Sequence, residues 1–403
     1  MLETRIKEEL KKGDEISIID LVDLLVKQAH LMRASDIHID PTSEGTRVRF
    51  RVDGVLQDIF SWPRRIHSEI ISRIKILTGL RTDEHQAAQD GRFRASVDGG
   101  RVIDIRVSIA PTYWGENAVL RLLADQTETF TLETLGFSQK NFERIMQALR
   151  KPYGMILATG PTGSGKTTTL YTMIKRLNTK EVSIITIEDP IEYAVEGVEQ
   201  VQINSRTGLT FATGLRSFLR QDPNIIMVGE IRDIETAGLA VNTSLTGHLL
   251  LSTLHTNDAA TTLPRLLDMK VEPYLVASTV NIAIGQRLVR KICQNCKTKR
   301  RITNSEYKSL SDILPLETKR QRTFSFGKGC ELCNGTGYQG RMGIHEVLFV
   351  DNDIREAILR RASASDIKKI AIKNGMVGMV EDGFLKAKAG LTTIDEVIRV
   401  FYE

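Results

Sequence analysis

The feature that most constrains the fold of this chain is a glycine-rich octapeptide at residues 160–167, which reads Gly-Pro-Thr-Gly-Ser-Gly-Lys-Thr. A short apolar run (154–159) precedes it, and a helix-like run (168–177) follows it. Between a strand and a helix this pattern is a P-loop, whose glycines let main-chain N–H groups close around phosphate oxygens. It indicates an α/β fold with a nucleotide held at the amino end of the helix.

Within this loop the chemistry assigns separate roles. Lys166 is expected to reach the β- and γ-phosphates, and Thr167 is expected to ligate magnesium. The amino end of the following helix adds partial positive charge. The residues predicted to bind ATP are Gly160, Pro161, Thr162, Gly163, Ser164, Gly165, Lys166, Thr167 and Thr168.

Two later apolar runs end in acidic residues. Residues 183–187 lead into Glu188, and residues 224–228 lead through a glycine into Glu230. In an open parallel sheet ligands lie at the carboxyl ends of the strands, so both carboxylates are expected to face the P-loop. We predict that Glu230 acts as the base that orients the attacking water and that Glu188 supports the metal and its waters, with the reverse assignment left open.

The first 123 residues follow other periodicities and predict an α+β domain. Apolar residues at helical spacing after Ser17 predict a helix over 18–32. Residues 47–60 alternate apolar residues with arginines around an Asp53-Gly54 turn, which predicts a β-hairpin. Its outer face is either a solvated sheet face or an interface. The remaining predicted elements are a helix at 65–77 and strands at 91–97, 102–108 and 118–123.

The rest of the chain carries weaker local signals. The polar stretch 124–131 lacks either periodicity and is predicted to be a linker that acts as a hinge. Alternating strand-like and helix-like runs follow and predict a parallel sheet. Beyond residue 351 the pattern indicates short helices, the clearest at 366–374, with Ser365 as its N-cap, and at 394–402.

Composition excludes several classes of protein. Hydrophobic residues make up 41% and charged residues 26% of the 403, which excludes wholesale disorder. The net charge of +5 comes without an aromatic-rich basic stripe, so no direct nucleic-acid partner is expected. The start of the chain has no apolar leader and no run reaches about 18 apolar residues, so the chain is expected to be cytoplasmic.

All four cysteines lie in two Cys-x-x-Cys pairs, at 293–296 and 330–333. Two such pairs suit a tetrahedral zinc held by four thiolates, with no open position for catalysis. The predicted zinc ligands are Cys293, Cys296, Cys330 and Cys333, and the expected role is to hold a loop-rich insert together. The alternative is four reduced free thiols.

Several segments carry a specific resemblance. The P-loop is joined by Ile-Glu-Asp-Pro-Ile-Glu at 187–192, Val-Gly-Glu-Ile-Arg-Asp at 228–233, and Thr-Gly-His with Ser-Thr-Leu-His-Thr-Asn within 246–257. Ala-Ser-Asp-Ile-His-Ile at 34–39, Arg-Val-Asp-Gly at 51–54 and Gln-Asp-Gly-Arg at 89–92 extend the match. Together they resemble the type II secretion and type IV pilus assembly ATPases, the GspE/PilB family of traffic ATPases, over nearly the whole chain.

The resemblance implies a homo-hexameric ring with ATP sites between an N-terminal domain and a RecA-like core. By position it implies that Arg106 and Arg121 neutralise charge on the γ-phosphoryl group, the alternative being surface ion pairs. His255 and His248 match the family's His box, where an imidazole near the γ-phosphate reports the nucleotide state; the alternative is a structural histidine. Three further matching arginines near the site or subunit contacts are Arg216, Arg220 and Arg232.

The resemblance also bears on partners and on the cysteine module. It implies an inner-membrane platform protein as partner, with pilin or pseudopilin machinery engaged indirectly, and so a peripheral position at the inner face of the cell membrane. A cysteine module indicates assembly or secretion, since retraction ATPases generally lack it. Only a short lead-in precedes residue 18, where family members commonly carry a further docking domain, so docking is expected to differ or to be reduced.

These observations predict an α/β chain with a RecA-like P-loop NTPase core, an N-terminal α+β domain, a tetracysteine zinc-binding insert and a helical C-terminal region. The predicted segments are a lead-in (1–15), the N-terminal domain (16–123), a linker (124–136), the core (137–290), the cysteine module (291–345) and the C-terminal region (346–403). The predicted function is a magnesium-dependent hexameric ATP hydrolase that powers pilus or pseudopilus assembly. The alternatives are a RecA-like DNA-translocating or DNA-uptake ATPase and a zinc-stabilised interaction protein that binds nucleotide without turnover.

Overall fold

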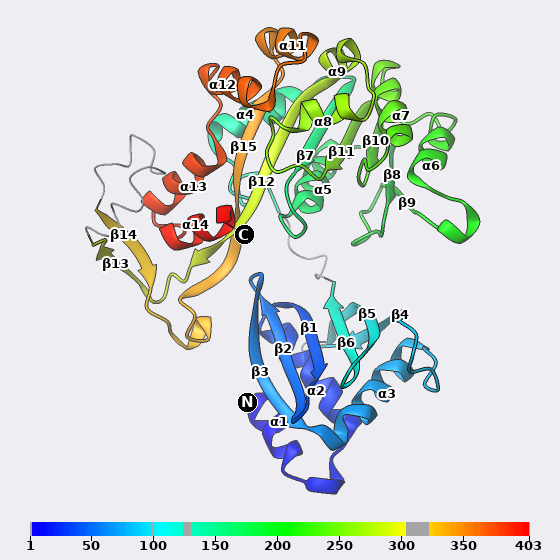
Figure 1. Cartoon of the computed structure of the whole chain (residues 1–403), viewed down its shortest axis with the longest axis vertical. Helices are drawn as coiled ribbons and strands as arrows, with labels where there is room; N and C mark the ends of the chain where they lie inside the picture. Colours follow the sequence, from blue (N-terminus) through cyan, green and yellow to red (C-terminus); the bar gives the residue numbers. More distant parts are fainter. Residues whose placement is uncertain (1, 98–99, 124–129, 304–321, 403) are drawn as a thin grey trace. The chain divides into compact units, whose positions relative to one another are not determined.

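In the computed structural model the chain forms two units, Met1–Glu128 and Thr129–Glu403, each with its own hydrophobic core (Figure 1). The structure describes residues 2–97, 100–123, 130–303 and 322–402. The division between the units falls within the predicted linker at 124–136, of which residues 124–129 lie outside the described residues.

The first unit is a six-stranded antiparallel sheet in the order β3-β2-β1-β6-β5-β4. Alternating apolar residues of the strands bury one face of the sheet in a core shared with the helices. The strands are β1 (Ala34–Pro41), β2 (Gly45–Val52), β3 (Val55–Pro63), β4 (Gln89–Ser96), β5 (Val102–Thr112) and β6 (Gly115–Leu122). The helices are α1 (Leu2–Leu10), α2 (Ile18–Leu31) and α3 (His67–Thr78).

Two local signals in this unit are as the sequence predicts, whereas part of the predicted lead-in at 1–15 forms helix α1. Ser17 caps α2 by accepting a hydrogen bond from the main-chain N–H of Asp20 (3.3 Å). Asp53 and Gly54, both at positive φ, form the two-residue turn between β2 and β3.

The arginine-lined face of this hairpin is matched by carboxylates on the neighbouring strands. The nitrogen–oxygen distances are 4.0 Å from Arg47 to Asp58, 2.8 Å from Arg49 to Asp40, and 3.5 Å from Arg51 to Asp36.

The second unit is built on a seven-stranded sheet in the order β15-β12-β7-β11-β10-β8-β9. All neighbouring strands are parallel except the pair β12–β15, so the parallel sheet predicted from the alternating pattern is confirmed. The strands are β7 (Gly154–Thr159), β8 (Ile184–Glu188), β9 (Glu199–Gln202), β10 (Ile225–Val228), β11 (Leu249–Leu254), β12 (Val280–Ile292) and β15 (Tyr338–Phe349).

Helices pack on both faces of this sheet, which is why its central strands are almost continuously apolar. The helices of the two packed cores include α4 (Gln139–Leu149) and α5 (Lys166–Leu177) on one side, and α6 (Phe211–Phe218), α7 (Ile234–Leu245), α8 (Thr262–Asp268), α9 (Pro273–Thr279), α11 (Asn352–Leu359) and α12 (Ala364–Lys373) on the other. No helix of the described residues is both long and apolar enough to span a bilayer.

A small ribbon and two helices complete the unit. The ribbon pairs β13 (Lys297–Arg301) with β14 (Thr323–Gly327), and the helices are α13 (Met379–Lys388) and α14 (Ile394–Tyr402). The prediction that Ser365 caps the helix near 366 is wrong. Ser363 is the cap, because its hydroxyl accepts from the main-chain N–H of Asp366 (3.2 Å) and α12 begins one residue after it.

Candidate functional site

The P-loop joins β7 to α5. β7 is buried along its whole length and ends at Thr159. The loop then continues to Lys166, where α5 begins. Gly163 and Gly165 take φ values of +77° and +85°, which glycine adopts without steric cost. The first main-chain N–H groups of a helix lack partners within the helix. The turn therefore leads into an anion-binding position at the amino end of α5.

Lys166 lies across this loop. Its Nζ donates to the main-chain oxygens of Gly160 (2.8 Å) and Pro161 (3.0 Å). Burial lowers the pKa of Lys166, and the charge of Glu230 opposes part of that change. Ser164 Oγ is buried with no hydrogen-bond partner among the described residues, which costs about 1–3 kcal/mol if left unpaired. A cation and an unsatisfied hydroxyl in one loop fit a phosphate ligand.

Glu230 and His255 follow β10 and β11, so they lie at the same carboxyl edge of the sheet as the P-loop. His255 Nε2 is 2.9 Å from Glu230 Oε2, and Arg232 pairs with the other carboxylate oxygen. Burial raises the pKa of Glu230, but the hydrogen bonds from Arg232 and His255 outweigh it and the net pKa is lowered. Glu230 is therefore an anion at neutral pH.

The loop that carries His255 is fixed to the P-loop strand by hydroxyl groups. Thr159 Oγ1 donates to the main-chain oxygen of Thr256 (2.7 Å) and accepts from its main-chain N–H (3.0 Å). Sequence reasoning missed this contact, and it also missed Gln286, a buried amide on β12 that contacts the P-loop. Thr159 and Gln286 lie outside the motifs on which the sequence prediction rests. A threonine or glutamine inside an apolar strand gives no signal of what lies across the sheet from it.

Glu188 ends β8 at the same edge of the sheet, but its carboxylate is already engaged. It is 3% exposed and accepts hydrogen bonds from Tyr171 on α5, from Thr186 Oγ1 (2.6 Å) and from Gln200 Nε2 (3.2 Å). Burial and the charge of Glu188 raise the pKa of Tyr171, which therefore stays a hydrogen-bond donor. Glu188 thus fixes α5 against the sheet.

Three other sequence-predicted residues of the second unit make contacts with residues outside this cluster. Arg216 pairs with Glu235, and Arg220 donates to the main-chain oxygen of Arg216 (3.2 Å). His248 precedes β11, at the amino edge of the sheet, and its Nδ1 lies 3.1 Å from the main-chain oxygen of Thr243.

Arg106 and Arg121 belong to the first unit, on β5 and β6, where strand register places them directly opposite each other. Arg121 Nε donates to Asp36 Oδ1 (2.9 Å). The same row across the sheet continues to Arg92 on β4 and to Arg51 on β2. Like charges directly opposite each other destabilise a sheet, so a row of four arginines and one aspartate is a surface suited to an anionic ligand.

The four cysteines meet at one point, although 33 residues separate the two pairs in sequence. The Sγ–Sγ distances are 3.8 Å for Cys293–Cys330, 3.9 Å for Cys296–Cys333 and 3.7 Å for Cys330–Cys333. A tetrahedral zinc with Zn–S bonds of about 2.3 Å separates its sulfurs by about 3.8 Å. Main-chain N–H groups of Cys330 and Gly337 donate to Cys333 Sγ at 3.2 Å. The cluster fits a zinc ion.

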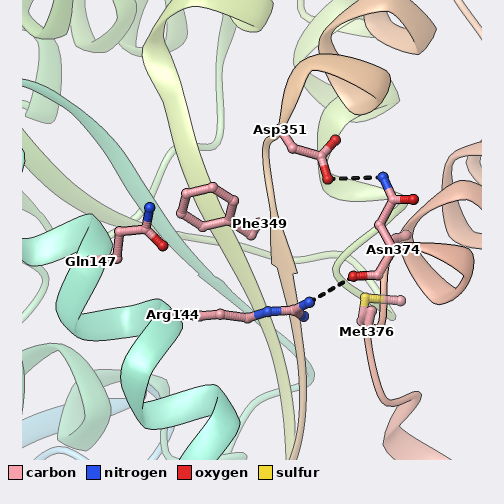
Figure 2. Close-up of a pocket in the computed structure, with 7 residues that line it drawn as sticks. Arg144, Gln147, Phe349, Asp351, Asn374 and Met376 are labelled. Atoms are coloured by element: carbon pink, nitrogen blue, oxygen red, sulfur yellow. Dashed lines mark hydrogen bonds between the residues drawn. The ribbon is translucent and has the colours of Figure 1, made fainter.

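A separate small pocket lies on another part of the second unit, lined by side chains of α4, β15 and the segment after α12 (Figure 2). Arg144 donates to the main-chain oxygens of Val347 (3.1 Å) and Asn374 (3.0 Å), and Asn374 donates to Asp351 Oδ2 (2.9 Å). These bonds tie α4 to the C-terminal helices. No P-loop residue lines this pocket, so we assign it a structural role.

The chain matches known proteins over almost its full length. Residues 11–399 match the family model described as "Type II/IV secretion system protein". The type IV pilus assembly ATPase PilB of Thermus thermophilus is 45% identical over 385 residues, 96% of this chain and 43% of that protein. The type II secretion system protein E of Xanthomonas campestris pv. campestris is 47% identical over 388 residues, 96% of this chain and 68% of that protein.

A solved structure shares the fold. The pilus retraction motor PilT with bound ADP superposes with a TM-score of 0.63 at 26% identity, covering 94% of this chain and 96% of that one. The predicted fold class and family resemblance are confirmed by these matches.

Proposed function

The chain belongs to the family of type II/IV secretion system proteins, and from that premise we propose that it is an ATP-hydrolysing motor that powers pilus or pseudopilus assembly. The observation that carries the proposal is the meeting of Lys166, Glu230 and His255 at one edge of a parallel sheet. Relatives named as a pilus assembly ATPase and as a type II secretion protein support it.

In the proposed reaction the P-loop binds the triphosphate, and a residue at a neighbouring strand end positions the attacking water. Lys166 exchanges its bonds to two loop carbonyls for bonds to β- and γ-phosphate oxygens. Glu230, held as an anion by Arg232 and His255, accepts a hydrogen bond from the attacking water and orients it towards the γ-phosphorus. His255 contacts Glu230 directly, so a change at the γ-phosphate alters the loop that follows β11.

Thr167, in the first turn of α5, is the residue we propose to hold magnesium, which when bound neutralises charge on the β- and γ-phosphate oxygens. Glu188 supports that site indirectly in this proposal. Both of its oxygens already accept hydrogen bonds from protein donors, so it acts by holding α5 and its first turn in place. Glu230 has one protein donor on each oxygen, and its charge acts on Lys166, so we propose Glu230 rather than Glu188 as the base.

The first unit is proposed to supply Arg106 and Arg121 to the phosphates. Guanidinium groups neutralise the charge that spreads over the γ-phosphoryl oxygens during transfer, and the cross-strand arginine row places several on one face. We propose that the chain works as a homo-hexameric ring on an inner-membrane platform protein. We propose that the chain acts in the cytoplasm, peripherally at that membrane, and contacts pilin or pseudopilin only indirectly.

The cysteine cluster is proposed to hold zinc through Cys293, Cys296, Cys330 and Cys333. Zinc there would supply four bonds that fold the insert, without an open position for chemistry. The ion therefore has a structural role, separate from turnover.

Steady-state phosphate release by the purified chain, with ATP and magnesium, tests the proposal. We expect measurable turnover that Lys166→Ala abolishes while the fold is kept, because the loop loses its cation. Absence of turnover in the parent chain with retained nucleotide binding would favour an interaction protein. Strong stimulation by DNA with steep salt dependence would favour a DNA translocase.

A further inference from the structure

Gln286 is a buried amide that no motif explains. It lies in the middle of β12 and is 1% exposed. β12 pairs with β7 in parallel, so Gln286 is carried to the carboxyl edge of the sheet where β7 runs into the P-loop. Burying an uncharged amide costs free energy unless both its ends are hydrogen-bonded.

Both ends of this amide are satisfied by the nucleotide loop and its helix. Gln286 Nε2 donates to the main-chain oxygen of Ser164 (2.7 Å), and Gln286 Oε1 accepts from Thr169 Oγ1 on α5 (2.9 Å). An amide with one donor and one acceptor contact has its orientation fixed by the two partners. The side chain therefore spans from the tip of the P-loop to the first turn of α5.

The main-chain oxygen of Gln286 also limits the position of the P-loop. A Cβ placed on Gly160 would collide with the main-chain oxygen of Gln286, so the first residue of the loop rests against β12. Gly165 lies next to the amide itself, because a Cβ there would sit 3.3 Å from Gln286 Nε2. β12 thus contacts the loop at its beginning, at Ser164 and at its end.

We infer that Gln286 is a positioning residue that holds the P-loop in the shape that accepts phosphate. This inference rests on the proposed nucleotide-binding function. Gln286 acts on the loop rather than on the phosphates, by holding the Ser164 carbonyl and the Thr169 hydroxyl in place through its two hydrogen bonds. Without it the loop has more conformations, and the apparent affinity for nucleotide falls with the fraction of loops that stay in the competent shape.

The test is ADP binding to the full chain, followed by fluorescence of a labelled ADP, because binding needs no chemistry. Gln286→Met keeps the length of the side chain and removes both hydrogen bonds. We expect Gln286→Met to raise the Kd for ADP about tenfold, which corresponds to about 1.4 kcal/mol, because only a fraction of the loops then keeps the competent shape. Thr169→Val removes only the hydrogen bond to Gln286 Oε1. The double variant, with Gln286→Met and Thr169→Val together, should bind ADP no more weakly than Gln286→Met alone.

Asn281 offers a matched control on the same strand. It is also a buried amide with one donor and one acceptor contact, to the Tyr153 main-chain oxygen and to Lys151 Nζ, both at 2.9 Å. These contacts lie at the amino end of β7, away from the P-loop. Asn281→Leu should therefore lower the unfolding midpoint while leaving the Kd for ADP within about twofold of the parent value.

The outcomes separate this inference from the proposed function. If the parent chain binds ADP and Gln286→Met raises Kd and KM for ATP about tenfold with kcat changed less than threefold, the positioning role is supported. If Gln286→Met and Asn281→Leu lower stability equally and neither changes Kd, Gln286 is structural and the inference is wrong. If the parent binds no nucleotide, the proposed function fails, and the positioning role fails with it.

Discussion

Glu396 on α14 provides the most quantitative prediction for the stability of the second unit. Its side chain is 2% exposed and accepts hydrogen bonds from the main-chain N–H of Arg290 (3.0 Å), from the Arg290 guanidinium (2.6 Å) and from Arg399 (2.9 Å). Arg290 belongs to β12, three residues before the first cysteine. The carboxylate therefore anchors the last helix to the strand that leads into the cysteine cluster.

The magnitude follows from the pKa of this carboxyl. Burial raises its pKa, but the hydrogen bonds from Arg399 and Arg290 outweigh burial and hold it at about 2, against an ordinary value of 4.5. Each tenfold change in proton affinity is worth about 1.4 kcal/mol, so the charged form contributes about 3 kcal/mol. Because the folded pKa is depressed, this stability is fully present above pH 4.5 and is lost as the pH falls towards 2.

The assay is urea unfolding of the full chain, followed by fluorescence and circular dichroism, at pH 7 and pH 5.5. Glu396→Gln should lower the free energy of unfolding by about 3 kcal/mol at both values. Asp395→Asn, which changes the exposed neighbouring acid, should cost less than about 0.5 kcal/mol. Equal effects of the two variants, or a Glu396→Gln effect that disappears between pH 7 and 5.5, would show that the buried charge of Glu396 does not stabilise the fold.

Three further predictions address other parts of the chain. Cys330→Ser should reduce bound zinc, measured with a chromogenic chelator, from about one equivalent to below a tenth; an unchanged zinc content would contradict the four-sulfur site. Tyr171→Phe removes a hydrogen-bond donor from buried Glu188 and should lower the free energy of unfolding in urea by about 2 kcal/mol. An unaltered urea midpoint would mean that this hydrogen bond does not stabilise the fold. Arg121→Gln should lower kcat by at least about 100-fold, while Arg94→Gln, which breaks an exposed ion pair, should not; equal rates for both would remove Arg121 from the phosphate site.

The parts of the fold that the sequence predicts are those with strong local signals. The run before the P-loop is β7 at the predicted residues, Asp53-Gly54 is the predicted hairpin turn, and Ser17 is the predicted cap. In each of these cases residues close in sequence decide the structure. The prediction of Ser365 as the cap is wrong because Ser363 and Ser365 are both good caps, and only the packing of α12 selects between them.

The parts of the site that sequence could not predict depend on contacts between distant strands. The parallel order of the sheet implies that Glu230 and His255 share an edge with Lys166, so this grouping follows from strand ends alone. That Glu188 is fully hydrogen-bonded depends on Tyr171 and Gln200, which approach only in the folded core. Gln286 lies 122 residues from Ser164 and carries no motif, so its contact could not be read from spacing.

In the proposed reaction the loop ending at Lys166 binds the triphosphate, and Glu230 orients the attacking water. ATP binding and phosphate release by Glu230→Gln, measured side by side on the same preparation, test this division of roles. We predict that this variant binds ATP within about threefold of the parent affinity and releases phosphate at less than about 1% of the parent rate. Phosphate release near the parent rate would show that another group orients the water and that Glu230 is not the base.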